Sequence, residues 1–185
     1  QITTQSYEFG KALSDIETTG NTNKTGTKVT FLPDDSIFQT TEYHFDVIDE
    51  RLRELAYLNS GIRIHLNDER EQNKSTEHYY EGGLSQFIEH LDEGHKAVFE
   101  QPIQVKGERE NIPVDVALRY NDSYNETILA FVNNINTIEG GTHLAGFKTA
   151  LTRSLNQYAQ KNNLFKPAKG KTLSLSGDDT REGLT

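Results

Sequence analysis

The stretch that decides the fold class is Gly140-Gly-Thr-His-Leu-Ala-Gly-Phe-Lys-Thr-Ala-Leu-Thr-Arg-Ser-Leu-Asn-Gln-Tyr158. Its apolar residues recur every three or four positions, which predicts an amphipathic helix with the stripe Leu144, Phe147, Leu151, Leu155 and Tyr158. The glycine pair interrupts the chain before this helix. The Thr142 hydroxyl can accept a hydrogen bond from a free backbone N–H of the first turn, so we predict Thr142 as the N-cap.

Upstream of this helix the hydrophobic pattern changes period several times. Helical spacing predicts helices over residues 45–56 and 84–91, and a capping-box pattern at Asp179–Glu182 predicts another helix start. Apolar alternation and short apolar runs predict strands at residues 3–7, 27–32, 62–66, 77–80, 97–99, 103–105, 114–120 and 127–132, with a weaker one at 172–175. We expect hairpins that pair 62–66 with 77–80 and 114–120 with 127–132. The pattern is α+β, with a domain boundary at Gly82-Gly83.

The net charge conceals an uneven distribution. The chain of 185 residues carries 28 acidic and 19 basic side chains, a net of −9, which argues against a general nucleic-acid binder. Residues 1–82 account for −7 and residues 83–185 for −2. Between Gly140 and Gly177 there is no acid, and six cations fall there: Lys148, Arg153, Lys161, Lys166, Lys169 and Lys171. This segment is either an ordinary solvated surface or a surface for anions.

Composition excludes several kinds of protein. The absence of cysteine rules out a disulfide framework, a thiolate metal site and a cysteine nucleophile. No apolar run approaches the ~18–20 residues that cross a bilayer, and no apolar segment opens the chain. The six histidines form no metal-binding motif, so we predict no metal site. Because the chain starts at Gln1 and contains no Met, we expect a processed chain or a piece of a longer one.

Two short motifs have both a functional and a structural interpretation. Four Asn-x-Ser/Thr triplets would suit a glycosylated extracellular binding module, but such triplets are frequent by chance in a chain so rich in Asn and Thr, and we favour chance; they start at Asn23, Asn73, Asn121 and Asn125. Gly140-Gly141 could present backbone N–H groups to a phosphate, or simply form a tight turn, since the spacing of a P-loop is missing. The residues alone therefore show an α+β protein without a complete active site.

Several longer strings resemble the B subunits of bacterial DNA gyrase. They are Arg51-Leu-Arg-Glu-Leu-Ala-Tyr-Leu-Asn-Ser-Gly61, Tyr80-Glu-Gly-Gly83, Asn133-Asn-Ile-Asn-Thr-Ile-Glu-Gly-Gly-Thr-His-Leu-Ala-Gly-Phe-Lys-Thr-Ala-Leu-Thr-Arg153 and Gly177-Asp-Asp-Thr-Arg-Glu-Gly-Leu184. The weaker string Lys24-Thr-Gly-Thr-Lys-Val-Thr-Phe-Leu-Pro-Asp34 fits the same family. The matches follow the family order and reach from about residue 25 to the last residue.

The resemblance implies a fold and an activity. Residues 1–82 would be the C-terminal part of a GHKL-type ATPase α/β sandwich, and residues 83–185 a transducer domain with a left-handed βαβ crossover, incomplete at its C-terminus. The parent protein would use ATP and Mg²⁺ to drive DNA strand passage and negative supercoiling. Its partners would be the gyrase A subunit in an A2B2 enzyme, double-stranded DNA, and a second copy of itself at the N-gate, in the bacterial cytoplasm. The corresponding subunit of topoisomerase IV, which decatenates and relaxes DNA, is the alternative.

The resemblance also assigns residues. Thr27 matches the strand threonine that helps to bind adenine. Transducer basic residues line the DNA-holding cavity of the dimeric gate in the family, and Lys148 matches a position where relatives carry Lys or Arg. We expect Lys148 and Arg153 to face DNA, and Arg153, Lys161 and the Lys166–Lys171 loop could extend the positive surface. The family's catalytic Glu, its Mg²⁺-binding Asn and its Gln-Thr-Lys loop fall outside this sequence. We therefore expect no catalytic residue here, and no ATPase activity from this chain alone.

Overall fold

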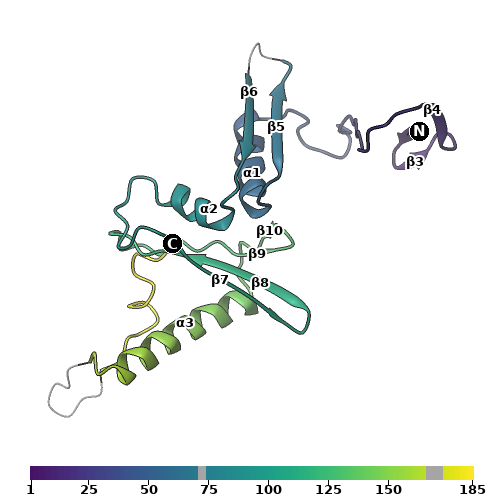
Figure 1. Ribbon diagram of the computed structural model, residues 1–185. Helices are drawn as coiled ribbons and strands as arrows, with labels where there is room; N and C mark the ends of the chain where they lie inside the picture. Colours follow the sequence, from purple (N-terminus) through teal and green to yellow (C-terminus); the bar gives the residue numbers. More distant parts are fainter. Residues whose placement is uncertain (71–73, 166–172) are drawn as a thin grey trace. The chain divides into compact units, whose positions relative to one another are not determined.

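The computed structural model describes residues 1–70, 74–165 and 173–185, and it divides the chain into two compact units, Gln1–Tyr43 and His44–Thr185 (Figure 1). The described residues form three helices and ten short strands, and each strand pair among them is antiparallel. The predicted α+β class is confirmed. Across the described ranges, no helix is long and apolar enough to cross a membrane.

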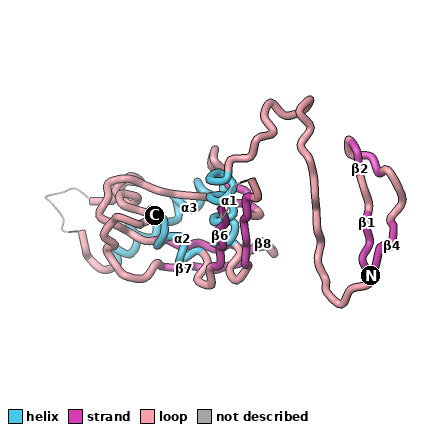
Figure 2. The backbone as a smooth tube through the Cα atoms, turned by 90° about the horizontal axis from the view of Figure 1, so that it is seen from above, coloured by secondary structure: helices cyan, strands magenta, loops and turns pink. Residues whose placement is uncertain are grey.

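The first unit consists of two small hairpins followed by extended chain. Strand β1 (Ile2–Thr4) pairs with β4 (Glu17–Gly20), and β2 (Tyr7–Glu8) pairs with β3 (Lys11–Ala12). From residue 21 to residue 44 the backbone forms loops and turns, as the tube in Figure 2 shows. No residue of this fully described unit is buried.

The strand predicted at residues 27–32 does not form in this unit. Val29 and Phe31, whose alternation predicts a core-facing side, are 77% and 73% exposed. An alternating segment becomes a strand only when a neighbour accepts its backbone hydrogen bonds. In this unit β1 pairs with β4 and β2 with β3, and no strand pairs with residues 27–32.

The second unit begins with α1 (Phe45–Leu58), which lies alongside the hairpin of β5 (Arg63–Asp68) and β6 (Lys74–Tyr79) (Figure 1). Helix α2 (Leu84–Leu91) follows Gly82-Gly83. The ring of Tyr57 stacks on Tyr80 and on Phe87, at centroid distances of 3.7 and 4.9 Å. Both predicted helices and the predicted hairpin are confirmed. In each of them the apolar residues lie on one face, which can be buried against a neighbouring element.

A buried carboxylate joins α1 to β6. Asp49, on the second turn of α1, lies 2.7 Å from His78 Nε2 and accepts a hydrogen bond from the Thr76 hydroxyl. Arg53 donates to the other oxygen of the same carboxylate at 2.7 Å. His78 is 4% exposed, so hydrogen bonding compensates the loss of water around these polar groups.

Strand pairing after α2 differs from the prediction. Strand β8 (Ile112–Leu118) pairs with β7 (Ile103–Arg109), not with residues 127–132. Glu110 and Asn111 both have left-handed φ, +53° and +63°, and form a two-residue turn between these strands. Such a turn closes with less entropy loss than the longer loop that the predicted pairing needs.

A second tight hairpin contacts α1. Strands β9 (Phe131–Val132) and β10 (Ile135–Asn136) are joined through Asn133 and Asn134, both with positive φ. The guanidinium of Arg51 donates to the Asn134 carbonyl at 2.6 Å, and the Asn134 side chain donates to Asn59 Oδ1 at 3.0 Å. These bonds fix the hairpin against α1.

The last three residues form an isolated antiparallel β-bridge beside residues 119–121. The N–H of Arg119 donates to the Thr185 carbonyl, and the Thr185 N–H donates back to Arg119, at 2.8 and 2.9 Å. Leu184 is 1% exposed. Asp92 accepts hydrogen bonds from Arg119, Asn121 and Thr185, so a buried polar cluster joins the end of α2, the residues after β8 and the C-terminal segment.

Candidate functional site on helix α3

Helix α3 (Thr142–Lys161) carries the predicted DNA-facing residues. Its N-cap is Gly141, and Thr142 is the first helical residue, so the predicted cap is wrong by one position. Gly140 and Gly141 have φ of +80° and +151°, and a Cβ on Gly141 would lie 2.8 Å from the His143 ring. Only glycine accepts both the positive φ and the close approach of the His143 ring. The helix therefore starts at Thr142, one residue earlier than a Thr142 N-cap would start it.

One face of α3 binds the C-terminal segment, residues 173–185, through polar side chains spaced by four. The Thr152 and Thr180 hydroxyls lie 2.8 Å apart. Asn156 donates to the Leu175 carbonyl at 2.9 Å and accepts from the Leu175 N–H at 2.8 Å. Residues 148, 152 and 156 fall on one side of a helix of 3.6 residues per turn, so they face the same segment.

The C-terminal segment begins with a capping box. The Ser176 hydroxyl accepts from the Asp179 N–H at 3.2 Å, and the Asp179 carboxylate accepts from the Ser176 N–H at 2.7 Å. This pair lies three residues before the box predicted at Asp179–Glu182, and the helix predicted to start there is wrong, because residues 177–183 form turns. Residues 173–175 form no strand, and residue 172 lies outside the described ranges.

Lys148 is not a free cation in this structure. Its ammonium and the Arg181 guanidinium both form ion pairs with the carboxylate of Glu126. The side chains of Lys148 and Glu126 are each 30% exposed, and that of Arg181 is 16% exposed. Burial alone would raise the pKa of Glu126, but hydrogen bonds from the two cations more than offset it and lower that pKa. We call these three residues the Glu126 ion-pair node.

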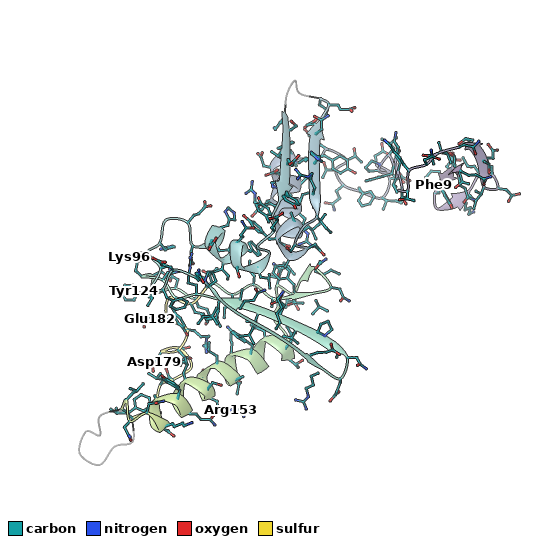
Figure 3. The ribbon with its side chains drawn as sticks, in the orientation of Figure 1. Phe9, Lys96, Tyr124, Arg153, Asp179 and Glu182 are labelled. Atoms are coloured by element: carbon teal, nitrogen blue, oxygen red, sulfur yellow. The ribbon has the colours of Figure 1, made fainter. Side chains whose placement is uncertain are left out.

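Arg153 lies on α3 with an exposed side chain. Its side chain forms no hydrogen bond or ion pair within the parts of the chain that the structure describes, and Figure 3 labels it on α3 on the side away from Asp179. Residues 148 and 153 are five apart, which turns them by about 140° around the helix. The structure therefore places the two predicted cations on different faces. Lys161 is exposed in the last turn, and the Lys166–Lys171 loop lies outside the described residues.

Thr27 lies in the first unit, in the loop that follows β4. It is exposed and lines a hollow of 2330 Å³ that only residues of this unit surround. The volume exceeds the ~300–1,000 Å³ of a small-molecule site. Outside the undescribed gaps at 71–73 and 166–172, no group of three His, Asp or Glu residues is arranged to hold a metal ion.

Two residues of the site were missed by sequence reasoning. Glu126 stands alone among polar neighbours and no local pattern marks it. Arg181 belongs to the string Gly177–Leu184 that carries the family resemblance, but nothing in that string indicates a partner in α3. Both residues acquire meaning only through contacts across 22 and 55 positions.

Residues 83–185 match the family model for DNA gyrase B. The chain belongs to this family. It is 52% identical over 182 residues to the DNA gyrase B protein of Clostridium acetobutylicum and 48% identical over 182 residues to that of Halalkalibacterium halodurans. Each alignment covers 98% of this chain and 28% of the relative, so the chain spans less than a third of those proteins.

Solved structures show the same fold. The 43K ATPase domain of Thermus thermophilus gyrase B, crystallised with an aminocoumarin, matches with a TM-score of 0.80 and 36% identity, over 98% of this chain and 49% of that one. The ATP-binding domain of Francisella tularensis topoisomerase IV matches with a TM-score of 0.71 and 21% identity, over 98% of this chain and 48% of that one. The family and the fold class drawn from the sequence are confirmed.

Proposed function

We propose that the chain is a portion of the ATP-hydrolysing subunit of DNA gyrase, and that the whole protein couples ATP turnover to DNA strand passage and negative supercoiling. The observation that carries this proposal is the family match of residues 83–185. The parent protein would act in the bacterial cytoplasm with the gyrase A subunit, with a second copy of itself and with double-stranded DNA. ATP and Mg²⁺ would bind mainly to parts of the parent outside this sequence.

The two halves of the chain would have different tasks. Residues 1–82 would complete the ATPase domain, where Thr27 would contact adenine. Residues 83–185 would form the transducer, which changes position with the nucleotide state. A nucleotide shifts such an equilibrium only through contacts that differ between the two states. The chain alone lacks most of those contacts, so we expect it to hydrolyse no ATP.

Helix α3 would face the transported DNA duplex. The segment between Gly140 and Gly177, which contains α3, has no acidic residue to repel phosphates. Within it, the side chain of Arg153 is exposed and can bind a phosphate. Contacts between cations and phosphates are independent of base sequence and weaken as salt rises. This fits an enzyme that must pass any duplex through itself.

The function is tested with the full-length protein assembled with its gyrase A partner. We expect ATP-dependent negative supercoiling from the wild type and a strong reduction with Arg153→Ala, at unchanged ATP affinity. Decatenation or relaxation without supercoiling would favour the topoisomerase IV alternative. Absence of all three activities from a correctly folded assembly would contradict the proposal.

Thr27 is tested in the same full-length protein. Thr27→Ala should raise the KM for ATP, and Thr30→Ala serves as a matched control because the alternation places residue 30 on the other face of the strand predicted at 27–32. Equal KM values for both variants would remove Thr27 from the nucleotide site. The chain alone should release no phosphate from ATP, and turnover that a substitution within it abolishes would show that it is competent after all.

A further inference from the structure

The Glu126 ion-pair node contains a carboxylate between two cations that come from distant parts of the chain. Lys148 belongs to α3, Arg181 to the C-terminal segment, and Glu126 to a loop that contacts both. Asp178 also accepts a hydrogen bond from Arg181 at 2.9 Å, but Asp178 is almost fully exposed. Glu126 is therefore the partner that restricts both cations.

A carboxylate held by a lysine and an arginine resembles a backbone phosphate in charge and in hydrogen-bond acceptors. We propose that Glu126 is an internal competitor for DNA phosphate, which occupies Lys148 and Arg181 until duplex DNA displaces it. This inference rests on the proposed function, since it concerns how the DNA-facing surface of α3 is regulated. Lys148 and Arg181 would bind phosphate when Glu126 leaves.

The structure makes such an exchange feasible. The ion pair between Glu126 and Lys148 is partly exposed, so water and salt screen it, and pairs of this kind contribute little to stability. Glu126 lies in a loop without helix or strand. The adjacent Thr127 is anchored separately, by its N–H to the Leu184 carbonyl at 2.8 Å. The carboxylate can therefore turn away without unfolding the segment that carries it.

The experiment is a double-mutant cycle on DNA binding by the 185-residue chain. A short labelled duplex is titrated at several KCl concentrations with wild type, Glu126→Gln, Lys148→Ala and the double variant. Glu126→Gln should tighten binding and steepen the slope of log K against log salt by about 0.9 for each newly engaged phosphate. Glu108→Gln is the matched control, since it changes the net charge equally at an exposed position of β7 without a described ion pair.

Lys148 gives the decisive comparison. Lys148→Ala should change binding little in the wild type and should remove the part of the Glu126→Gln gain that Lys148 provides, leaving the part from Arg181. If Lys148→Ala weakens DNA binding equally in the wild type and in Glu126→Gln, Glu126 does not compete with DNA, although Lys148 does contact it. If Lys148→Ala changes DNA binding in neither the wild type nor Glu126→Gln, and Arg153→Ala leaves the salt slope unaltered, the proposed DNA-facing role of α3 is wrong. A gain from Glu108→Gln equal to that from Glu126→Gln would reduce the effect to net charge and overturn the proposal.

A second measurement uses the unmodified chain and does not depend on any variant folding. NMR titration of the Glu126 carboxyl carbon should show its pKa rising toward the ordinary value of 4.5 when duplex DNA is added. An unchanged pKa at saturating DNA would overturn displacement. Inorganic phosphate at matched ionic strength should leave the pKa unchanged, and an equal rise would overturn a DNA-specific exchange in favour of a site for free anions.

Discussion

The hydroxyl of Thr185 donates a hydrogen bond of 2.6 Å to the carboxylate of Asp92, across 93 positions of sequence. The Asp92 side chain is fully buried, and Arg119 donates to its other oxygen at 2.6 Å. A buried carboxylate is tolerated only when its hydrogen-bonding capacity is filled. This contact therefore fixes the C-terminal segment to the end of α2.

Asp92→Asn should destabilise the second unit strongly. The amide keeps the shape of the carboxylate but leaves the charge of Arg119 buried without a counter-ion, which costs about 3–5 kcal/mol. Urea denaturation measures the loss of unfolding free energy. A double variant, Asp92→Asn with Arg119→Met, should recover part of it. A cost near zero for Asp92→Asn would show that the cluster forms without the charge.

Acid should unfold the chain through the same group. Burial would raise the pKa of Asp92, but hydrogen bonds from Thr185, Arg119 and Asn121 lower it below its ordinary value of 3.8. The folded state thus binds this proton less tightly than the unfolded state, and the stabilisation is present above 3.8 and lost as pH falls through the lower folded pKa. Thermal denaturation should show a steep fall in Tm below about pH 4, and the fall should be shallower in Asp92→Asn. Parallel curves would exclude Asp92 as the cause.

Gly183→Ala should cost more than Gly94→Ala, although both glycines have left-handed φ, +70° and +90°. A Cβ at residue 94 meets nothing within 4 Å, so only backbone strain of roughly 1–2 kcal/mol is expected there. A Cβ at residue 183 would lie 2.6 Å from the Asn121 carbonyl oxygen. That overlap adds about 1–3 kcal/mol, and chemical denaturation of the two variants isolates it. Equal costs would mean that the C-terminal segment shifts to accommodate the added Cβ.

The sequence predicts the parts of this fold that depend on local pattern. Helices α1, α2 and α3 and the β5–β6 hairpin follow from apolar spacing and turn residues. Spacing also assigns Tyr158 to the buried stripe of α3, but it is 63% exposed and Ala159 is buried in its place. The spacing of apolar residues alone does not reveal which side of the helix is covered most closely.

Contacts between distant residues were beyond sequence reasoning. Residues 112–118 can pair with the strand on either side, and the geometry of the Glu110-Asn111 turn decides for β7. The ion pairs of Glu126 and the cluster around Asp92 join residues that share no local pattern. Lys148 and Arg153 do lie on one helix as predicted, and the prediction that both face DNA awaits its test.

Salt titration of DNA binding by Arg153→Ala tests whether α3 presents cations to DNA phosphates. The control is Arg109→Ala, which removes an equal charge from the end of β7, where the side chain is 90% exposed. We predict that the slope of log K against log salt becomes shallower by about 0.9 with Arg153→Ala and stays at the wild-type value with Arg109→Ala. A wild-type slope for Arg153→Ala would show that Arg153 does not contact DNA phosphate.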